Sequence, residues 1–371
     1  MKKIAIFLTF FYFVQILHAS HNRAGEILYK RIAPFTTTSN GIITDVYTYS
    51  ITVIKYTDDG ATIADRCIDT VYFGDGTRTA VSRSNGTGTL SCQCSPLCGD
   101  IIQNLPGFRV KKNVYSAVHT YPGPGQYVVY SIDFGRNASI ANIPNSLNQT
   151  FYIESLIVAN SSIGNNSSPV LNYPPIDLAT NVNCFYHQAN AIDAEGDSIS
   201  YQLIPCKGLN GQAINGYSNP PVNASGYFFM GTSGLISWCM PPSIGEYNIA
   251  FYVKEWRKNS SGVYQLIGLV ERDLQVLVMA GVVGMPDESS NKNNLTVYPT
   301  PFSTQLSVTD KSDTGELMHA DLLSLDGKLL MSGTLLDGKI DFSTKQLDNG
   351  LYLLKITKGE TITYKKIFKS N

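Results

Sequence analysis

The sequence has little charge and, beyond its first residues, no long apolar run. Only 15% of its 371 residues are charged, and 28 Lys and Arg stand against 29 Asp and Glu. No basic run with interleaved aromatics occurs, so binding to nucleic acid or to acidic lipid is not expected. No later segment approaches the roughly 20 apolar residues of a membrane-spanning helix. These absences argue against nucleic-acid partners and against a helical anchor in the body of the chain.

The motifs of common hydrolases are also missing. The sequence contains no Gly-x-Ser-x-Gly, no His-Glu-x-x-His and no phosphate-binding loop. No nucleophile motif accompanies His119, which is interpreted as a packed core residue. Asp193 and Glu195 are two residues apart in a turn, and such neighbours rarely flank a sugar ring. The sequence therefore predicts a protein that is not an enzyme. The alternative is a secreted hydrolase, or an accessory glycan-binding component of a degradative system.

The first residues have the pattern of a secretory signal. Lys2 and Lys3 precede an apolar run from Ile4 to Leu17, and Ala19 supplies a small residue for cleavage. The run is too short for a membrane anchor. No Cys lies at the cut site, which argues against a lipoprotein. We expect a signal peptide over residues 1–19 and an exported mature protein.

All seven cysteines lie in the exported part, where disulfides persist. The disulfide candidates are Cys67, Cys92, Cys94, Cys98, Cys184, Cys206 and Cys239. The first four can form two bridges. Among the last three, one thiol must stay free or pair between molecules, and spacing does not give the connectivity. A metal site at the cluster "CQCSPLC" is the alternative, but Cys-x-x-Cys knuckles and a His partner are missing.

The composition indicates β-structure. Tyr occurs 22 times, and runs such as "DVYTYSITVIKY" alternate apolar and polar residues. We expect an all-β chain with β-sandwich domains over residues 20–160 and 165–280, a linker over 281–294 and a small β-sandwich over 295–371. Trp238 and Trp256 lie in strand-like runs, so we expect most aromatics to be core residues.

The last unit has a specific order of short motifs: "VYPTPF", "LLSLDGKLL", "LDNGLYLLKI" and "KKIFK". This order is similar to the type A carboxyl-terminal sorting domain of the Bacteroidetes type IX secretion system, with Thr300 where the family usually has Asn. The residues that carry the resemblance are Tyr298, Pro299, Pro301, Phe302, Gly327, Gly350, Tyr352, Lys365 and Lys366. The resemblance implies recognition by the type IX secretion machinery and removal of the tail. Release, or attachment to surface lipopolysaccharide, would follow. From the residues alone, Lys365, Lys366 and Lys369 are expected to line an exposed edge strand.

The two larger units also resemble known families. "VYFGDGTRT" and "VHTYPGPGQYVVY" resemble the signatures of polycystic-kidney-disease (PKD) type sandwiches. "NSSPVLNYPPIDLA" and "AIDAEGDSISYQL" resemble cadherin-like domains of the immunoglobulin-like sandwich type. Their combined order is similar to the amino-terminal region of gliding-motility-associated surface proteins of Bacteroidetes. This resemblance implies a cell-surface or secreted adhesion module. Its ligand, a protein or a glycan, is not specified.

Three acids in the second unit are candidate calcium ligands. Asp193, Glu195 and Asp197 are spaced at every second residue, so their carboxylates could converge on one hard cation. An EF-hand is excluded, because its twelfth position would be Ile204. The cadherin-like resemblance supports calcium, with Glu255 or Asp273 as completing ligands. The alternative is an acidic turn shaped by Asp and Gly. No other cofactor is expected.

Overall fold

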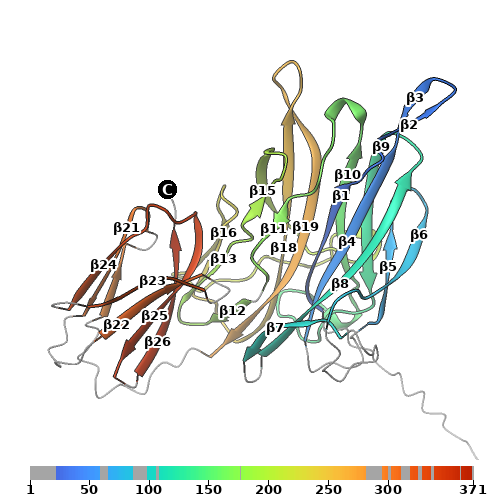
Figure 1. Cartoon of the computed structure of the whole chain (residues 1–371). Helices are drawn as coiled ribbons and strands as arrows, with labels where there is room; N and C mark the ends of the chain where they lie inside the picture. Colours follow the sequence, from blue (N-terminus) through green and yellow to red (C-terminus); the bar gives the residue numbers. More distant parts are fainter. Residues whose placement is uncertain are drawn as a thin grey trace, which may run out of the picture.

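Nearly all regular secondary structure in the described residues consists of strands (Figure 1). The computed structural model describes residues 22–58, 66–86, 98–105, 108–175, 177–280, 295–299, 302–310, 318–324, 328–335, 338–359 and 361–369. The predicted signal peptide and linker lie outside these ranges. Helical structure in them is limited to three 3-10 turns, Ser146–Asn148, Ser161–Ile163 and Leu209–Gly211. The predicted all-β class is confirmed. Within the described ranges, no helix has the length and apolar character needed to cross a bilayer.

The amino-terminal part is built on one sheet whose strands curve around a shared core. Its strands are β1 (Asn22–Arg31), β2 (Thr36–Ser39), β3 (Ile42–Asp45), β4 (Tyr47–Asp58), β5 (Ile68–Tyr72), β6 (Arg78–Ser82), β7 (Asp100–Leu105), β8 (Phe108–Tyr121), β9 (Gly125–Asp133) and β10 (Phe151–Ala159). Alternation along β9 points every second side chain inward, whereas the second half of β4 is buried on both faces. Ile27 and Ile51 thereby meet Val71, Val129 and Ile153 in one buried core.

The middle part adds strands to the same sheet and covers them with a smaller one. Its strands are β11 (Val170–Leu171), β12 (Asp177–Thr180), β13 (Cys184–His187), β14 (Ala191–Ile192), β15 (Ser198–Ile204), β16 (Tyr227–Met230), β17 (Ile236–Cys239), β18 (Gly245–Lys258) and β19 (Tyr264–Met279). The small sheet has the order β13-β17-β16. Its Phe185 and Trp238 pack on Phe251 and Val276 of the large sheet. Trp238 is fully buried, as expected for a sandwich core.

Strand β19 joins the two parts. It pairs with β10 through Gly268, Leu269 and Val270, and with β1 through Asp273 and Leu274. It also pairs with β12 and, along its length, with β18. The predicted division near residue 160 is therefore crossed by one continuous sheet. The division into two domains stays a prediction.

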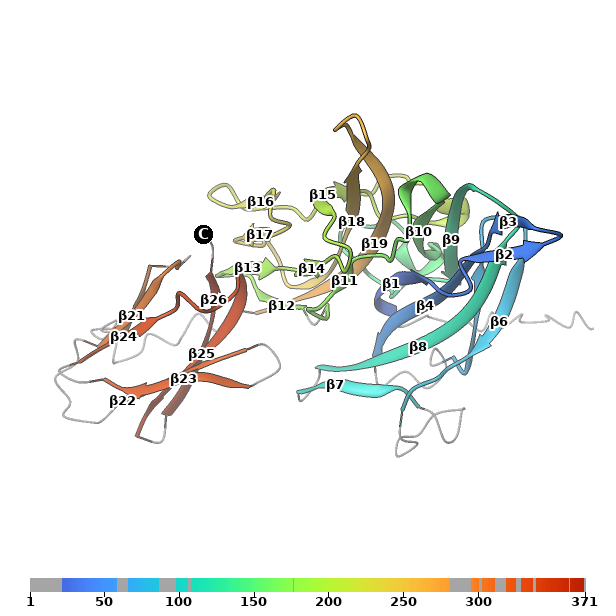
Figure 2. The same ribbon diagram turned by 45° about the horizontal axis from the view of Figure 1, so that its top comes forward.

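The carboxyl-terminal unit is a separate small sandwich, shown in red in Figures 1 and 2. Its strands are β20 (Leu295–Tyr298), β21 (Gln305–Asp310), β22 (Met318–Leu323), β23 (Leu329–Thr334), β24 (Lys339–Ser343), β25 (Gly350–Lys358) and β26 (Thr361–Lys369). They form the sheets β20-β21-β24 and β23-β22-β25-β26. Phe302, Leu306 and Leu354 are buried between these sheets.

Candidate functional site

Three carboxylates meet where the turn between β14 and β15 lies against β18. One carboxylate oxygen from each of Asp193, Asp197 and Glu255 lies within 4.8 Å of the other two. The pairing of β15 with β18, which sets Ile199 opposite Glu255, brings the turn to this place. Asp193 and Asp197, two of the three predicted calcium ligands, therefore lie close to Glu255, one of the two distant acids predicted to complete the site.

The turn explains why Glu195 is not part of this group. The Asp193 Oδ1 accepts a hydrogen bond of 2.6 Å from the Asp197 backbone N–H, and Gly196 has φ of +84°. Spacing by two residues keeps side chains on one face only in an extended strand. In this turn Glu195 is exposed, and its Oε1 accepts a hydrogen bond of 3.0 Å from the Ser167 hydroxyl. The acidic turn shaped by Asp and Gly, which was the alternative to a calcium site, is thus present together with the cluster of three carboxylates.

Glu255 is the buried member, with 0% of its surface exposed. Its Oε2 accepts hydrogen bonds from the Tyr29 hydroxyl at 3.1 Å and from the Asn166 side-chain amide at 3.3 Å. Gly268 on the neighbouring strand makes room for this contact, because a Cβ there would lie 2.0 Å from the Tyr29 hydroxyl oxygen. The Glu255 Oε1 and the Asp193 Oδ2 are buried and have no hydrogen-bond donor among the described residues. Two such acceptors are costly to bury unless a proton or a cation joins them.

The charges around this group are unevenly compensated. Burial, followed by the hydrogen bond and the charge of Asp193, raises the pKa of Glu255 to about 9. Arg257 holds Asp197 in a two-point ion pair, with its Nε 2.8 Å from the Asp197 Oδ1. Among the described residues, no Lys or Arg side chain donates a hydrogen bond to Asp193. An additional positive charge at Asp193 and Glu255 would relieve both orphaned oxygens.

Asp273, the other acid considered as a completing ligand, belongs to a different cluster. It is fully buried, and its Oδ2 lies 2.7 Å from the Arg136 guanidinium. Its Oδ1 accepts a hydrogen bond of 2.8 Å from Asn248. Both oxygens are therefore used within the protein.

The remaining side chains considered from the sequence have structural partners. The ring of His119 stacks on Phe73, with centroids 3.9 Å apart, and its Nε2 lies 2.7 Å from the Asp75 Oδ2. The half-buried Trp256 donates a hydrogen bond of 2.7 Å from its indole nitrogen to the Ser200 hydroxyl.

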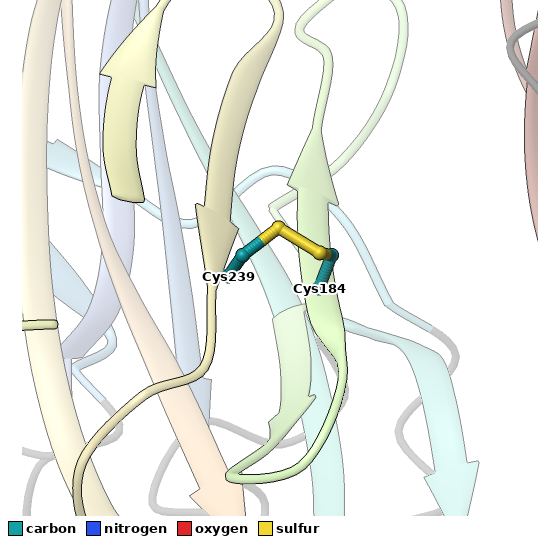
Figure 3. The surroundings of a disulfide bond; sticks show 2 residues. All are labelled: Cys184 and Cys239. Atoms are coloured by element: carbon teal, nitrogen blue, oxygen red, sulfur yellow. A yellow bond between two sulfur atoms is a disulfide. The ribbon is translucent and has the colours of Figure 1, made fainter. Parts of the chain in front are cut away.

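The cysteines of the middle part form one bridge and one free thiol. Cys184 on β13 is bonded to Cys239 on β17, directly across the strand pair (Figure 3). Cys206 is free and buried. Cys67 and Cys98 are disulfide-bonded, and Cys92 and Cys94 lie outside the described residues.

In the carboxyl-terminal unit, several motif residues build the core or its turns. Phe302 and Tyr352 are buried, with ring centroids 6.0 Å apart. The Tyr352 hydroxyl donates a hydrogen bond of 2.6 Å to the Asp348 carbonyl oxygen. Tyr298 is exposed at the end of β20, next to Pro299, and Gly350 begins β25. These contacts explain the motif spacing as sandwich geometry.

The basic residues lie on β26, which is the edge strand of its sheet. Lys365 and Lys366 are within this strand. Lys369 is buried, contrary to the expectation of an exposed lysine, because its backbone bridges to Phe302 on the segment that covers this end. Pro301, Gly327 and Thr300 lie outside the described residues.

A comparison with protein families decides the nature of this unit. Residues 296–370 match the Secretion system C-terminal sorting domain. The carboxyl-terminal unit is a type IX sorting domain. A sorting domain of this kind means that the protein is exported to the cell surface or the extracellular space. It also means that the type IX machinery handles the chain.

The comparisons that extend over the body in front of the sorting domain are weak. No curated protein matches the chain. The solved BSP domain of a biofilm associated protein is similar at 9% identity and a TM-score of 0.21, over 95% of this chain and 67% of that chain. Extracellular domains 3–5 of Drosophila OTK are similar at 10% identity and a TM-score of 0.16, over 87% of this chain and 91% of that chain. At these TM-scores the likeness carries no argument about the body.

Proposed function

We propose that this protein is a non-enzymatic adhesion or binding module of the cell surface or the extracellular medium. The observation that carries the proposal is a sorting domain placed behind a body of β-sheets whose interior is filled by its own side chains. Ile27, Phe151 and Trp238 are each fully buried in that interior. Such sheets leave their outer faces and loops as the surfaces that can engage a partner. The resemblances of the two larger units to PKD-like domains, cadherin-like domains and gliding-motility-associated surface proteins are part of the support for this proposal.

The composition of a surface cavity also favours binding over hydrolysis. A cavity of about 450 Å³ is lined by residues of the loop between β9 and β10. The lining residues are Ala138, Ser139, Ile140, Ala141, Ile143, Asn145, Ser146 and Leu147. None of them is an acid, a histidine or a thiol, the groups that general acid-base chemistry uses. The alternative function, a secreted hydrolase, would require catalytic residues outside this cavity.

We further propose that Asp193 and Glu255 hold a calcium ion, with Asp197 beside them. Calcium prefers carboxylate and carbonyl oxygens, and the two orphaned oxygens supply the first two ligands. The ion would replace the proton that Glu255 otherwise keeps. It would tie the turn before β15 to β18, and through Glu255 to Tyr29 on β1.

Cell-level experiments test the adhesion proposal. A strain lacking the protein should attach less well to surfaces, and attachment should return with the full chain. The purified chain, when incubated with polymeric substrates, should release no sugars or peptides from them. Unchanged attachment in the deletion strain, or sustained product release, would overturn the proposal. The mass of the surface species tests whether the tail is removed and whether lipopolysaccharide is attached.

A further inference from the structure

One long stretch of the body's sequence contains no charged residue. From Gly208 to Gly245 the sequence has no Asp, Glu, Lys, Arg or His, although 15% of the whole chain is charged. This stretch contains β16 and β17. Its loops are rich in side-chain amides and hydroxyls, and most residues of the segment 221–225 are Pro, Asn, Ala and Ser exposed to solvent. Exposed loops of this length without any charged residue are unusual, because charged residues are found mostly at the protein exterior.

The small sheet β13-β17-β16 presents two opposite faces. The row Phe185, Trp238 and Phe228 faces the core, as their shared cluster requires. The next row, formed by Tyr186, Ser237 and Phe229, must face outward, because successive side chains in a strand alternate. Figure 2 shows this sheet as a layer of its own beside the large sheet.

The outward face carries three aromatic rings. Tyr227, two residues before Phe229, lies opposite Cys239 and so shares the outward face. The rings of Tyr227 and Phe229 have centroids 5.6 Å apart and are tilted by 37°. Tyr186 completes the group from β13 and interacts with Tyr227 across the central strand. We call Tyr186, Tyr227 and Phe229 the aromatic platform.

The outward face is covered at its centre and exposed at its edge strand β16. Ser237 is in the centre of the outward face, and only 3% of its surface is exposed. Tyr227 and Phe229 keep 45% and 50% of their own surface exposed. The platform is thus open to solvent, and the disulfide between Cys184 and Cys239 links β13 to β17 on the same face.

We propose that the aromatic platform binds an uncharged polysaccharide. A pyranose ring has C–H groups on its faces and hydroxyls on its rim, so its faces stack on aromatic rings while its rim forms hydrogen bonds. Amides and hydroxyls such as Asn223, Ser225 and Thr232 lie in the segments next to β16. An anionic polymer would call for Lys or Arg, and this stretch has neither. The inference rests on the proposed binding function and names its ligand class.

Affinity electrophoresis with the purified full chain tests the platform. The gels contain a neutral β-glucan, a mannan or a xyloglucan, and polygalacturonate serves as the charged polymer. The test variant is Tyr227→Ala with Phe229→Ala. Both residues are half-exposed, so the fold should persist, and an unchanged melting temperature checks this. The control is Phe134→Ala, which removes a ring that is 72% exposed outside the platform.

We expect at least one neutral polysaccharide to retard the chain. The double variant should bind about tenfold or more weakly, since exposed aromatic anchors dominate such contacts, and Phe134→Ala should bind normally. Retardation by polygalacturonate alone, by no polymer, or equally for all three chains would overturn the proposal. Dimerisation that the double variant abolishes would reassign the platform to a second copy of the chain, and would overturn it as well.

The failure of this inference is distinguishable from the failure of the adhesion proposal. Cells that produce the double variant should attach to glycan-coated surfaces as poorly as the deletion strain. If they attach like the wild type while the deletion strain does not, adhesion stands and the platform is not its glycan site.

Discussion

The orphaned oxygens at Glu255 predict an unusual pH dependence of stability. The folded chain holds a proton on Glu255 up to about pH 9, whereas the unfolded chain loses it near the ordinary pKa of 4.5. The contribution of this group to the free energy of unfolding is therefore largest below pH 4.5. It falls by about 1.4 kcal/mol for each pH unit as the pH rises toward 9. At pH 7 the loss amounts to about 3 kcal/mol.

Glu255→Gln removes this dependence. The glutamine has nearly the same volume, cannot ionise, and can donate an amide hydrogen to the Asp193 Oδ2. We expect the variant and the wild type to have similar stability at pH 4.5 in EDTA. At pH 7 the variant should be more stable by about 3 kcal/mol. Urea unfolding at a series of pH values measures this difference.

The matched control is Glu195→Gln, which removes a carboxylate from the same turn at an exposed position. Its stability should follow the wild-type pH profile. If the difference between Glu255→Gln and the wild type stays constant from pH 5 to 8, then Glu255 has an ordinary pKa and the reasoning about its environment is wrong.

Further predictions concern the cation, the disulfide, the core and the tail. Millimolar calcium should raise the melting temperature of the wild type at pH 8 relative to EDTA, and Asp193→Asn should abolish the shift. Replacing Cys184 and Cys239 by Ser should cost about 4 kcal/mol, since the bridge closes a loop of 55 residues, and an unchanged urea midpoint would contradict this. Trp238→Ala should cost about 3–5 kcal/mol in the same assay, because the side chain is fully buried. A chain without residues 295–371 should remain inside the cell envelope, and immunodetection of that chain in the medium would refute this.

Local pattern was sufficient to predict the strands. The alternation in "DVYTYSITVIKY" predicts a strand, and β4 occupies most of this stretch. The sequence did not show that its second half is buried on both faces, with Val53 in one core and Ile54 in another. The motif "LDNGLYLLKI" contains the turn-forming pair Asn-Gly, and β25 begins at this glycine, Gly350. Both inferences use only residues that are neighbours in the chain, where sequence spacing fixes geometry.

The cluster of three carboxylates could be predicted only in part, because one of its members comes from a distant strand. Asp193 and Asp197 lie in one turn, so their proximity is visible in the sequence. Glu255 comes from β18, and its partner Tyr29 from β1, so their approach depends on strand pairing over long distances. Arg257, which neutralises Asp197, was missed, although a polar Glu-x-Arg pair in the apolar strand "NIAFYVKEWR" was a signal that could have identified it.

The pairing of β19 with strands of both parts of the body could not be predicted from periodicity either. Its sequence "YQLIGLVERDLQVLVM" has apolar runs on either side of the charged residues Glu271, Arg272 and Asp273, and most of the strand is buried. Nothing in that pattern states which neighbours it will have. Its contacts with β1 and β10 come from packing between segments more than 100 residues apart.

The position of β19 late in the chain sets the order in which the body can mature. During synthesis the amino-terminal strands emerge long before residues 264–279, so β1 and β10 must wait for the strand that bridges them. Contacts between such distant segments form slowly, and incomplete sheets stay open at their edges. A polypeptide destined for the cell surface or the extracellular space gains time in this way, because its first half cannot complete the final sheet until nearly all of the body has left the ribosome.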